Sequence, residues 1–331
     1  MTDRDVLRAR FVADQGWGDA VSRHLAGDAS FRRYFRLDRQ GATTVVMDAP
    51  PPNESVERFL AAGAWLAAAG ATTPEVHAAD VANGFLLLED LGDGQVGARI
   101  DRGADPAPYL ERAVDLLLHL HRHPAPDGLT PFDDDLRIER VLLLADWYAP
   151  AVLGAPLPDE ARARYEALWR ALLADSRYGR PVFVHRDFFA DNLVWLPERE
   201  GLAQLGVIDF QDGGAGPPAY DLMALGQDAR RDTDPALGDA LVARYLAGRP
   251  DLDPARFRTS LTVLAAQRHC RVIGLFTRLA VRDGKPWYLD HIPRLWRYLD
   301  GLLQEPVLAP IARWLDTYLP PGRRIIPPRP R

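Results

Sequence analysis

The most informative part of this 331-residue sequence is VFVHRDFFADNLVW at residues 182–195, followed after a turn by LGVIDF at residues 205–210. Apolar residues on both sides of the central loop predict short buried strands. The loop contains Asp187 and, five residues later, Asn192, while Asp209 ends the next strand. The chain therefore presents three oxygen-bearing side chains next to strands that can hold them in fixed positions.

This spacing suits phosphoryl transfer, in which a protein mainly positions groups and neutralises charge. Asp187 can accept the proton of an attacking hydroxyl, and Asn192 and Asp209 are the hard oxygen ligands that Mg²⁺ prefers. The order His-Arg-Asp, four residues, Asn also matches the catalytic loop of protein-kinase-like folds. We therefore predict Asp187 as catalytic base and Asn192 and Asp209 as metal ligands. His185 ends an apolar strand and is expected to be structural.

Strand and helix patterns divide the chain into two parts. Residues 32–48 alternate as two antiparallel strands with a turn near residues 40–41, and residues 84–88 predict a buried strand. A helix capped by Ser55 is expected over residues 54–69. Beyond residue 105 the apolar spacing predicts helices at residues 108–121, 136–150, 159–175, 235–247, 254–282 and 289–303.

Several motifs resemble the aminoglycoside phosphotransferase and choline kinase group of small-molecule kinases. They are HRDFFADN at residues 185–192, IDFQD at residues 208–212 and YDL at residues 220–222. LLLEDLGD at residues 86–93 is similar to the hinge of that group, where main-chain groups contact adenine. Among the hinge residues, the resemblance indicates Glu89 and Leu91 as nucleotide contacts.

The same resemblance implies an α+β, bilobal, protein-kinase-like fold that binds ATP and Mg²⁺ between its lobes. The small lobe would carry an antiparallel sheet and end at the hinge, over residues 1–92. The larger lobe would be mainly helical, over residues 93–331, and would carry the catalytic and acceptor-binding residues.

Three further stretches are similar to the bacterial kinases that phosphorylate N-acetylmuramate and N-acetylglucosamine at the anomeric hydroxyl during cell-wall recycling. They are GDASFRRYFR at residues 27–36, VMDAPP at residues 46–51 and the segment from Gln267 to Lys285. This resemblance implies an amino sugar as the phosphoryl acceptor.

The lysine that kinases of this fold carry on the third strand is missing, because Met47 occupies the aligned position and the only lysine is Lys285. Phosphates would be held by main-chain N–H groups of the Gly27–Ser30 loop and by the Ser30 hydroxyl. Strand alternation places Arg32 and Arg36 on one face, so either can supply the missing cation. These arginines can equally be solvated charges of an edge strand.

The acceptor side is predicted from charge. Residues 255–300 carry eight arginines and one lysine against three aspartates. Gln267 and Arg271 belong to one helical stripe and, with Gln211 and Asp212, are the expected substrate-binding residues. A cationic stripe favours a neutral or carboxylate-bearing sugar over a polycationic aminoglycoside, although a solvated helix face would look the same.

Composition excludes several other classes of protein. A net charge of −6 gives no footprint for nucleic acid, and no apolar run is long enough to span a membrane. The N-terminal residues lack a signal-peptide pattern, so a cytoplasmic protein is expected. Cys270 is the only cysteine, which excludes an internal disulfide and a cysteine-based zinc site. The oligomeric state stays open.

Two alternatives remain at this point. The same mechanism could act on an aminoglycoside, on choline or on another alcohol. The missing lysine also allows a non-catalytic binding protein on the same fold, although retention of all three oxygen ligands argues against it.

Overall fold

The computed structural model describes residues 2–25, 31–129 and 131–329. By its internal contacts the chain divides into two compact units. The first unit is Met1–Arg112 with Ala190–Gly213, and the second is Ala113–Phe189 with Gly214–Arg331. This division by contacts groups residues 190–213 with the N-terminal part. The division into a nucleotide-binding and a catalytic lobe at residue 92 stays a prediction.

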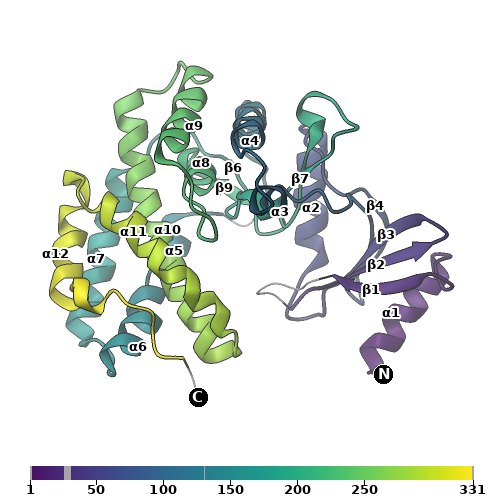
Figure 1. The fold of residues 1–331 in the computed structure, drawn as a ribbon, viewed down its shortest axis with the longest axis horizontal. Coiled ribbons are helices and arrows are strands. Elements are labelled where there is room, and N and C mark those ends of the chain that lie inside the picture. Colours follow the sequence, from purple (N-terminus) through teal and green to yellow (C-terminus); the bar gives the residue numbers. More distant parts are fainter. Residues whose placement is uncertain (1, 26–30, 130, 330–331) are drawn as a thin grey trace. The chain divides into compact units, whose positions relative to one another are not determined.

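The first unit is built on a five-stranded antiparallel sheet in the order β1-β2-β3-β5-β4 (Figure 1). The predicted hairpin at residues 32–48 is present, and its turn has positive φ at Gln40 (55°) and Gly41 (89°), as a two-residue hairpin turn requires. The predicted strand at residues 84–88 is also present. The strands are β1 (Val21–Leu25), β2 (Arg33–Arg39), β3 (Ala42–Asp48), β4 (Val76–Asp80) and β5 (Phe85–Glu89).

Alternation of side chains gives the two faces of this sheet different tasks. One face packs on α1 (Asp3–Asp14), where Phe11 meets Leu37, Val46 and Phe85 in a buried apolar cluster. Residues one position along the same strands, such as Tyr34 and Val45, face a pocket on the other side. The sheet is therefore a wall between an apolar core and a binding cavity.

A second hairpin, two α-helices and two 3₁₀ turns also belong to the first unit. In α2 (Val56–Ala68) the Ser55 hydroxyl bonds to the Glu57 carboxylate, so the expected side-chain cap is absent. Phe59 of α2 packs on Phe210, with ring centroids 4.6 Å apart. The remaining elements are α3 (Val96–Asp101), a 3₁₀ turn at Ala190–Asn192, β7 (Leu193–Trp195), a 3₁₀ turn at Gly201–Gln204 and β8 (Leu205–Val207).

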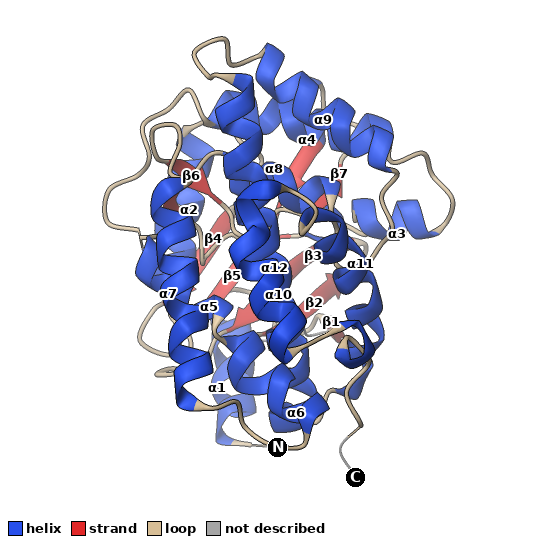
Figure 2. Cartoon of the chain, turned by 90° about the vertical axis from the view of Figure 1, so that its left-hand side faces the viewer, coloured by secondary structure: helices blue, strands red, loops and turns tan. Residues whose placement is uncertain are grey.

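The second unit is mainly helical (Figure 2). Its central helix, α10 (Pro254–Asp283), is buried along most of its length, and β6 (Val182–Val184) pairs with β9 (Gly214–Gly216). The other helices are α5 (Asp134–Val141), α6 (Ala149–Leu153), α7 (Asp159–Asp175), α8 (Ala219–Gly226), α9 (Pro235–Ala247), α11 (Ile292–Leu302) and α12 (Ala309–Tyr318), and α4 (Ala107–Leu120) contains the boundary between the units.

One predicted helix, at residues 136–150, is wrong in detail. The chain forms α5, then a π-helix at Leu144–Tyr148, then α6. At this break a Cβ on Gly274 of α10 would overlap the main chain of Leu143, so the two backbones are in direct contact. Pro150, which has no N–H to donate, is the second residue of α6. No helix in the described ranges is long and apolar enough to cross a membrane.

Candidate active site

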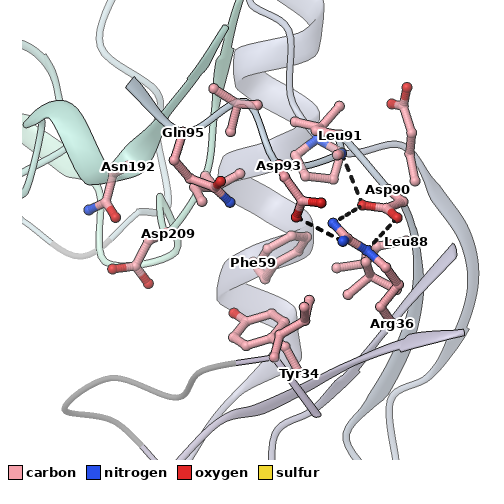
Figure 3. Close-up of a pocket in the computed structure, with 17 residues that line it drawn as sticks. Tyr34, Arg36, Phe59, Leu88, Asp90, Leu91, Asp93, Gln95, Asn192 and Asp209 are labelled. Carbon is pink, nitrogen blue, oxygen red and sulfur yellow. Dashed lines mark hydrogen bonds and ion pairs between the residues drawn. The ribbon is translucent and has the colours of Figure 1, made fainter. Parts of the chain in front are cut away.

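The first unit contains a cavity of about 340 Å³, a size in the range of small-molecule sites (Figure 3). Val45, Phe59 and Leu88 give it apolar walls. Glu89 and Leu91, the predicted adenine contacts, lie on its rim where β5 ends. The Glu89 carboxylate is held by Arg199 at 2.6 Å, and the Glu89 main-chain N–H donates to the Glu75 carbonyl at 2.8 Å.

Asn192 and Asp209, the predicted metal ligands, line the same cavity. The antiparallel pairing of β7 and β8 brings them together, and the Ile208 N–H donates to the Asn192 carbonyl at 3.1 Å. Asp209 has a φ of 61°, an unfavourable conformation for a non-glycine residue that is typical of functional positions.

Their donor set fits Mg²⁺, which binds one or two protein oxygens and completes its shell with phosphate oxygens and water. Across the described residues no group of three or more His, Cys, Asp or Glu side chains forms a metal cluster. A metal at Asn192 and Asp209 would therefore depend on ligands from a nucleotide.

Arg32, the residue just before β2, contacts one of the two predicted metal ligands. One of its Nη atoms lies 3.3 Å from Oδ1 of Asp209, and the other lies 2.9 Å from Oε2 of Glu54. Burial disfavours the charge of Arg32, but nearby acidic groups raise its pKa, so it stays a cation. Oε1 of Glu54 also accepts a hydrogen bond from the Phe31 main-chain N–H at 3.0 Å, which holds the Glu54 carboxylate next to Arg32.

Tyr34 and Met47 are cross-strand partners in the hairpin, and Tyr34 lines the cavity. Burial raises the pKa of the Tyr34 hydroxyl, which keeps it protonated. On β3, Met47 stands at the position that carries a lysine in other kinases of this fold. Polar groups come instead from Tyr34 in the neighbouring strand β2 and from Arg32 just before it.

The other two arginines of this segment are engaged elsewhere. Arg36 lies between Asp90 and Asp93, at 2.7 and 2.8 Å, and contributes to the cavity wall (Figure 3). Arg33 faces the opposite side of the sheet and pairs with the buried Asp48 at 2.6 Å. Alternation therefore separates Arg33 from the cavity as the sequence predicts. Ser30 and its loop lie outside the described residues.

Asp187, the predicted base, belongs to the second unit, directly after β6. The loop is fixed by Asp221, whose carboxylate accepts the main-chain N–H groups of His185 at 2.6 Å and Arg186 at 2.9 Å. Arg186 has a φ of 77°. Burial raises the pKa of Asp221 to about 6 although these donors favour its anion. His185 is almost fully buried beside Phe188, as expected of a structural histidine.

Two arginines of α10 flank the Asp187 carboxylate. Arg271 Nη2 lies 3.6 Å from one carboxylate oxygen and Arg268 Nη2 lies 3.7 Å from the other. Burial opposes ionisation of Asp187, but Arg271 and then Arg268 outweigh it and hold the pKa of this carboxyl below its usual value. Arg271 in turn donates to the Tyr220 hydroxyl at 3.1 Å. The Asp187 carboxylate is thus kept charged between two arginines.

The remaining predicted acceptor residues have different surroundings. Gln211 donates to Asp209 at 2.9 Å and therefore lies beside a predicted metal ligand in the first unit. Asp212 is half exposed and lies 3.9 Å from Arg58. Gln267 is fully buried and donates to the Arg137 carbonyl at 2.8 Å, so it joins α10 to α5.

Sequence reasoning missed Glu54, Tyr34 and Arg268. Glu54 follows a proline-rich turn and Arg268 lies 81 residues after the base, so local spacing gives no sign of either contact. For Arg268 the only available signal was its place beside Gln267 and Arg271 in the cationic helix.

The fold and these residues define a kinase-like phosphotransferase. The model of the phosphotransferase enzyme family matches residues 22–258, and the chain belongs to that family. Its family and kinase relatives imply ATP as phosphoryl donor.

An N-acetylmuramate/N-acetylglucosamine kinase from Caulobacter vibrioides is 38% identical, with 96% of this chain and 98% of that protein covered. A kinase of the same name from Pseudomonas putida is 36% identical, over 89% of this chain and 88% of its own. A choline/ethanolamine kinase family protein from Mesorhizobium loti has a similar structure, with a TM-score of 0.62 at 18% identity, over 95% of this chain and 99% of that one. The predicted family, kinase-like fold and kinase activity are confirmed.

Proposed function

We propose that this protein transfers the γ-phosphoryl group of ATP to the anomeric hydroxyl of an amino sugar of the N-acetylmuramate and N-acetylglucosamine type. Full-length similarity to kinases of that name supports the acceptor class. The charge around Asp187 supports it independently, because two arginines of α10 flank this carboxylate and favour a neutral or acidic acceptor over a cationic one. Since ATP is the donor, the reaction would take place in the cytoplasm.

In this proposal the first unit binds the nucleotide. Adenine would occupy the apolar cavity, with main-chain groups of Glu89 and Leu91 at its edge. Arg32 would contact the phosphates in place of the missing lysine, and Glu54 would hold Arg32 as a carboxylate does for the lysine in protein kinases. The loop before Arg32, including Ser30, would contribute further donors.

Asn192 and Asp209 would hold Mg²⁺. When bound, the metal would supply positive charge that offsets the negative charge of the phosphates. Gln211 and Arg32 orient the Asp209 carboxylate by direct contacts to Oδ1.

Asp187 would accept the proton as the sugar oxygen attacks the γ-phosphorus and ADP leaves. An anomeric hydroxyl is more acidic than an ordinary alcohol, so a carboxylate with a lowered pKa can still serve as its base. The single observation that carries the proposal is therefore Asp187 held between Arg268 and Arg271. This arrangement suits an acidic acceptor hydroxyl better than the hydroxyl of choline.

The test is ATP consumption against N-acetylmuramate, N-acetylglucosamine, choline and an aminoglycoside under the same conditions. We expect turnover with the two amino sugars and none above background with the cationic acceptors. Preferred turnover with choline or an aminoglycoside would reject the acceptor class, and ATP binding without any turnover would favour a non-catalytic protein.

A further inference from the structure

A second group of arginines lies where α5 packs along α10 in the second unit. Gln267 of α10 bonds to the Arg137 carbonyl of α5, and Gly274 of α10 contacts the main chain at Leu143. Arg140 lies between these two contact points on α5, so the packing places it alongside α10. Arg278 is on that helix, seven residues after Arg271 and hence on the same face.

The charges of Arg140 and Arg278 are poorly matched. Both side chains are partly buried, and within the described ranges neither Nε atom has a hydrogen-bond partner. Arg140 Nε lies 3.8 Å from a carboxylate oxygen of Glu139, whose side chain is mostly exposed. Arg282, one turn further along α10, is already paired with Asp283 at 2.6 Å. Among the described residues, the Nε–H donors of both guanidinium groups are thus left without a hydrogen bond.

Their electrostatic surroundings agree with this geometry. Burial, and then the charges of Arg282 and Arg140, lower the pKa of Arg278, and Asp283 only partly opposes them. Arg271 acts in the same direction as the other cations. A site in which cations repel one another is relieved when an anion binds.

Arg278 lies on the same face of α10 as Arg271, which is next to the predicted base. The positive charge of Arg271 contributes to the lowered pKa of Arg278. The same Arg271 has Nη2 3.6 Å from a carboxylate oxygen of Asp187. An acceptor whose hydroxyl is at Asp187 would therefore extend toward Arg140 and Arg278. The side chain of Gln267, which precedes Arg271 by one turn, is fully buried in the core and does not compete for such a ligand.

We propose that Arg140 and Arg278 form a binding site for the carboxylate of an acidic acceptor, the lactyl carboxylate of N-acetylmuramate being of this chemistry. The inference rests on the proposed function and deepens it, because N-acetylglucosamine has no carboxylate. Guanidinium groups recognise carboxylates through paired N–H donors, which Nε and Nη provide together. The site therefore determines preference between two acceptors that share one reaction.

The experiment compares kcat/KM for N-acetylmuramate and N-acetylglucosamine in the wild-type protein, in Arg278→Gln, in Arg140→Gln and in the double variant. Losing a charge-assisted contact should lower kcat/KM for N-acetylmuramate about 10-fold to 100-fold, mainly through KM. Values for N-acetylglucosamine should change less than about threefold. Arg258→Gln is the matched control, since this exposed arginine lies twenty residues before Arg278 on α10, and it should leave the ratio unchanged.

A substrate change tests the same contact without any mutation. The methyl ester of N-acetylmuramate has no charge and should lose, with the wild-type protein, the advantage that the free acid has. Arg278→Lys should keep part of the preference, and thermal unfolding of each variant identifies those that are merely destabilised.

An unchanged acceptor ratio in the double variant, or equal losses with both sugars, would overturn the carboxylate site. So would an ester as good as the acid, or a variant whose main defect is a raised KM for ATP, which would indicate a phosphate contact. Failure of the wild-type protein to phosphorylate either sugar would instead overturn the proposed function and the site together. Turnover of N-acetylglucosamine alone would reject the site and keep the kinase.

Discussion

Arg32 is the residue whose replacement tests the nucleotide site most sharply. In Arg32→Met the phosphates lose a charged donor near Asp209, and Glu54 loses its partner. A hydrogen bond to a charged group contributes about 1.5–3 kcal/mol, and each 1.4 kcal/mol is a factor of about ten. Because the Arg32 side chain is only 10% exposed, water screens it little and the upper part of that range applies. We expect KM for ATP to rise about 30-fold to 100-fold, with lower kcat, in steady-state assays.

Two companion variants make the result specific. Arg33→Met is the matched control, because this neighbouring arginine faces Asp48 on the other side of the sheet and should not alter ATP kinetics. Adding Met47→Lys to Arg32→Met should recover part of the loss, since alternation with Val45 places Met47 on the cavity face. Unchanged ATP kinetics in Arg32→Met, or equal effects of the changes at Arg32 and Arg33, would refute the assignment.

Three further outcomes are expected. Asp187→Asn should lower kcat about 100-fold to 10,000-fold while the Kd for ATP, measured by calorimetry, stays within about twofold, and a parallel loss of ATP affinity would contradict a role as base. Asp209→Asn should raise the Mg²⁺ concentration needed for half-maximal rate, with partial rescue by Mn²⁺, and an unaltered metal titration would exclude it as a ligand. Since Arg271 lowers the pKa of Asp187, the wild-type rate should fall only at acid pH. Arg271→Gln should raise that pKa and move the acid limb of the kcat/KM profile to higher pH. An unmoved acid limb would show that Arg271 does not act on Asp187.

Sequence spacing predicted the parts of the site that are close in the chain. Asp187, Asn192 and Asp209 belong to one loop and the following hairpin, so their order along the chain reflects their placement on strands. Alternation along a single strand likewise separated Arg32 from Arg33, because the period of a strand is fixed.

The rest depends on contacts between distant segments. Glu54 contacts Arg32 across 22 residues of sequence that contain the β2–β3 hairpin. Arg268 contacts Asp187 only because α10 packs beside the loop that carries Asp187. The helix α1 was not predicted, since half of its residues are charged and it buries a single large side chain, Phe11. The strand β1 was missed for a similar reason, as its residues are nearly all exposed.

The central claim is phosphoryl transfer to the anomeric oxygen of an amino sugar. Phosphorus–proton correlated NMR of the product made from N-acetylglucosamine and ATP measures this directly. We predict coupling of the new phosphorus signal to the proton at C1, and no product from the methyl glycoside, whose anomeric oxygen is blocked. Coupling to the protons at C6, or turnover of the methyl glycoside, would contradict the account.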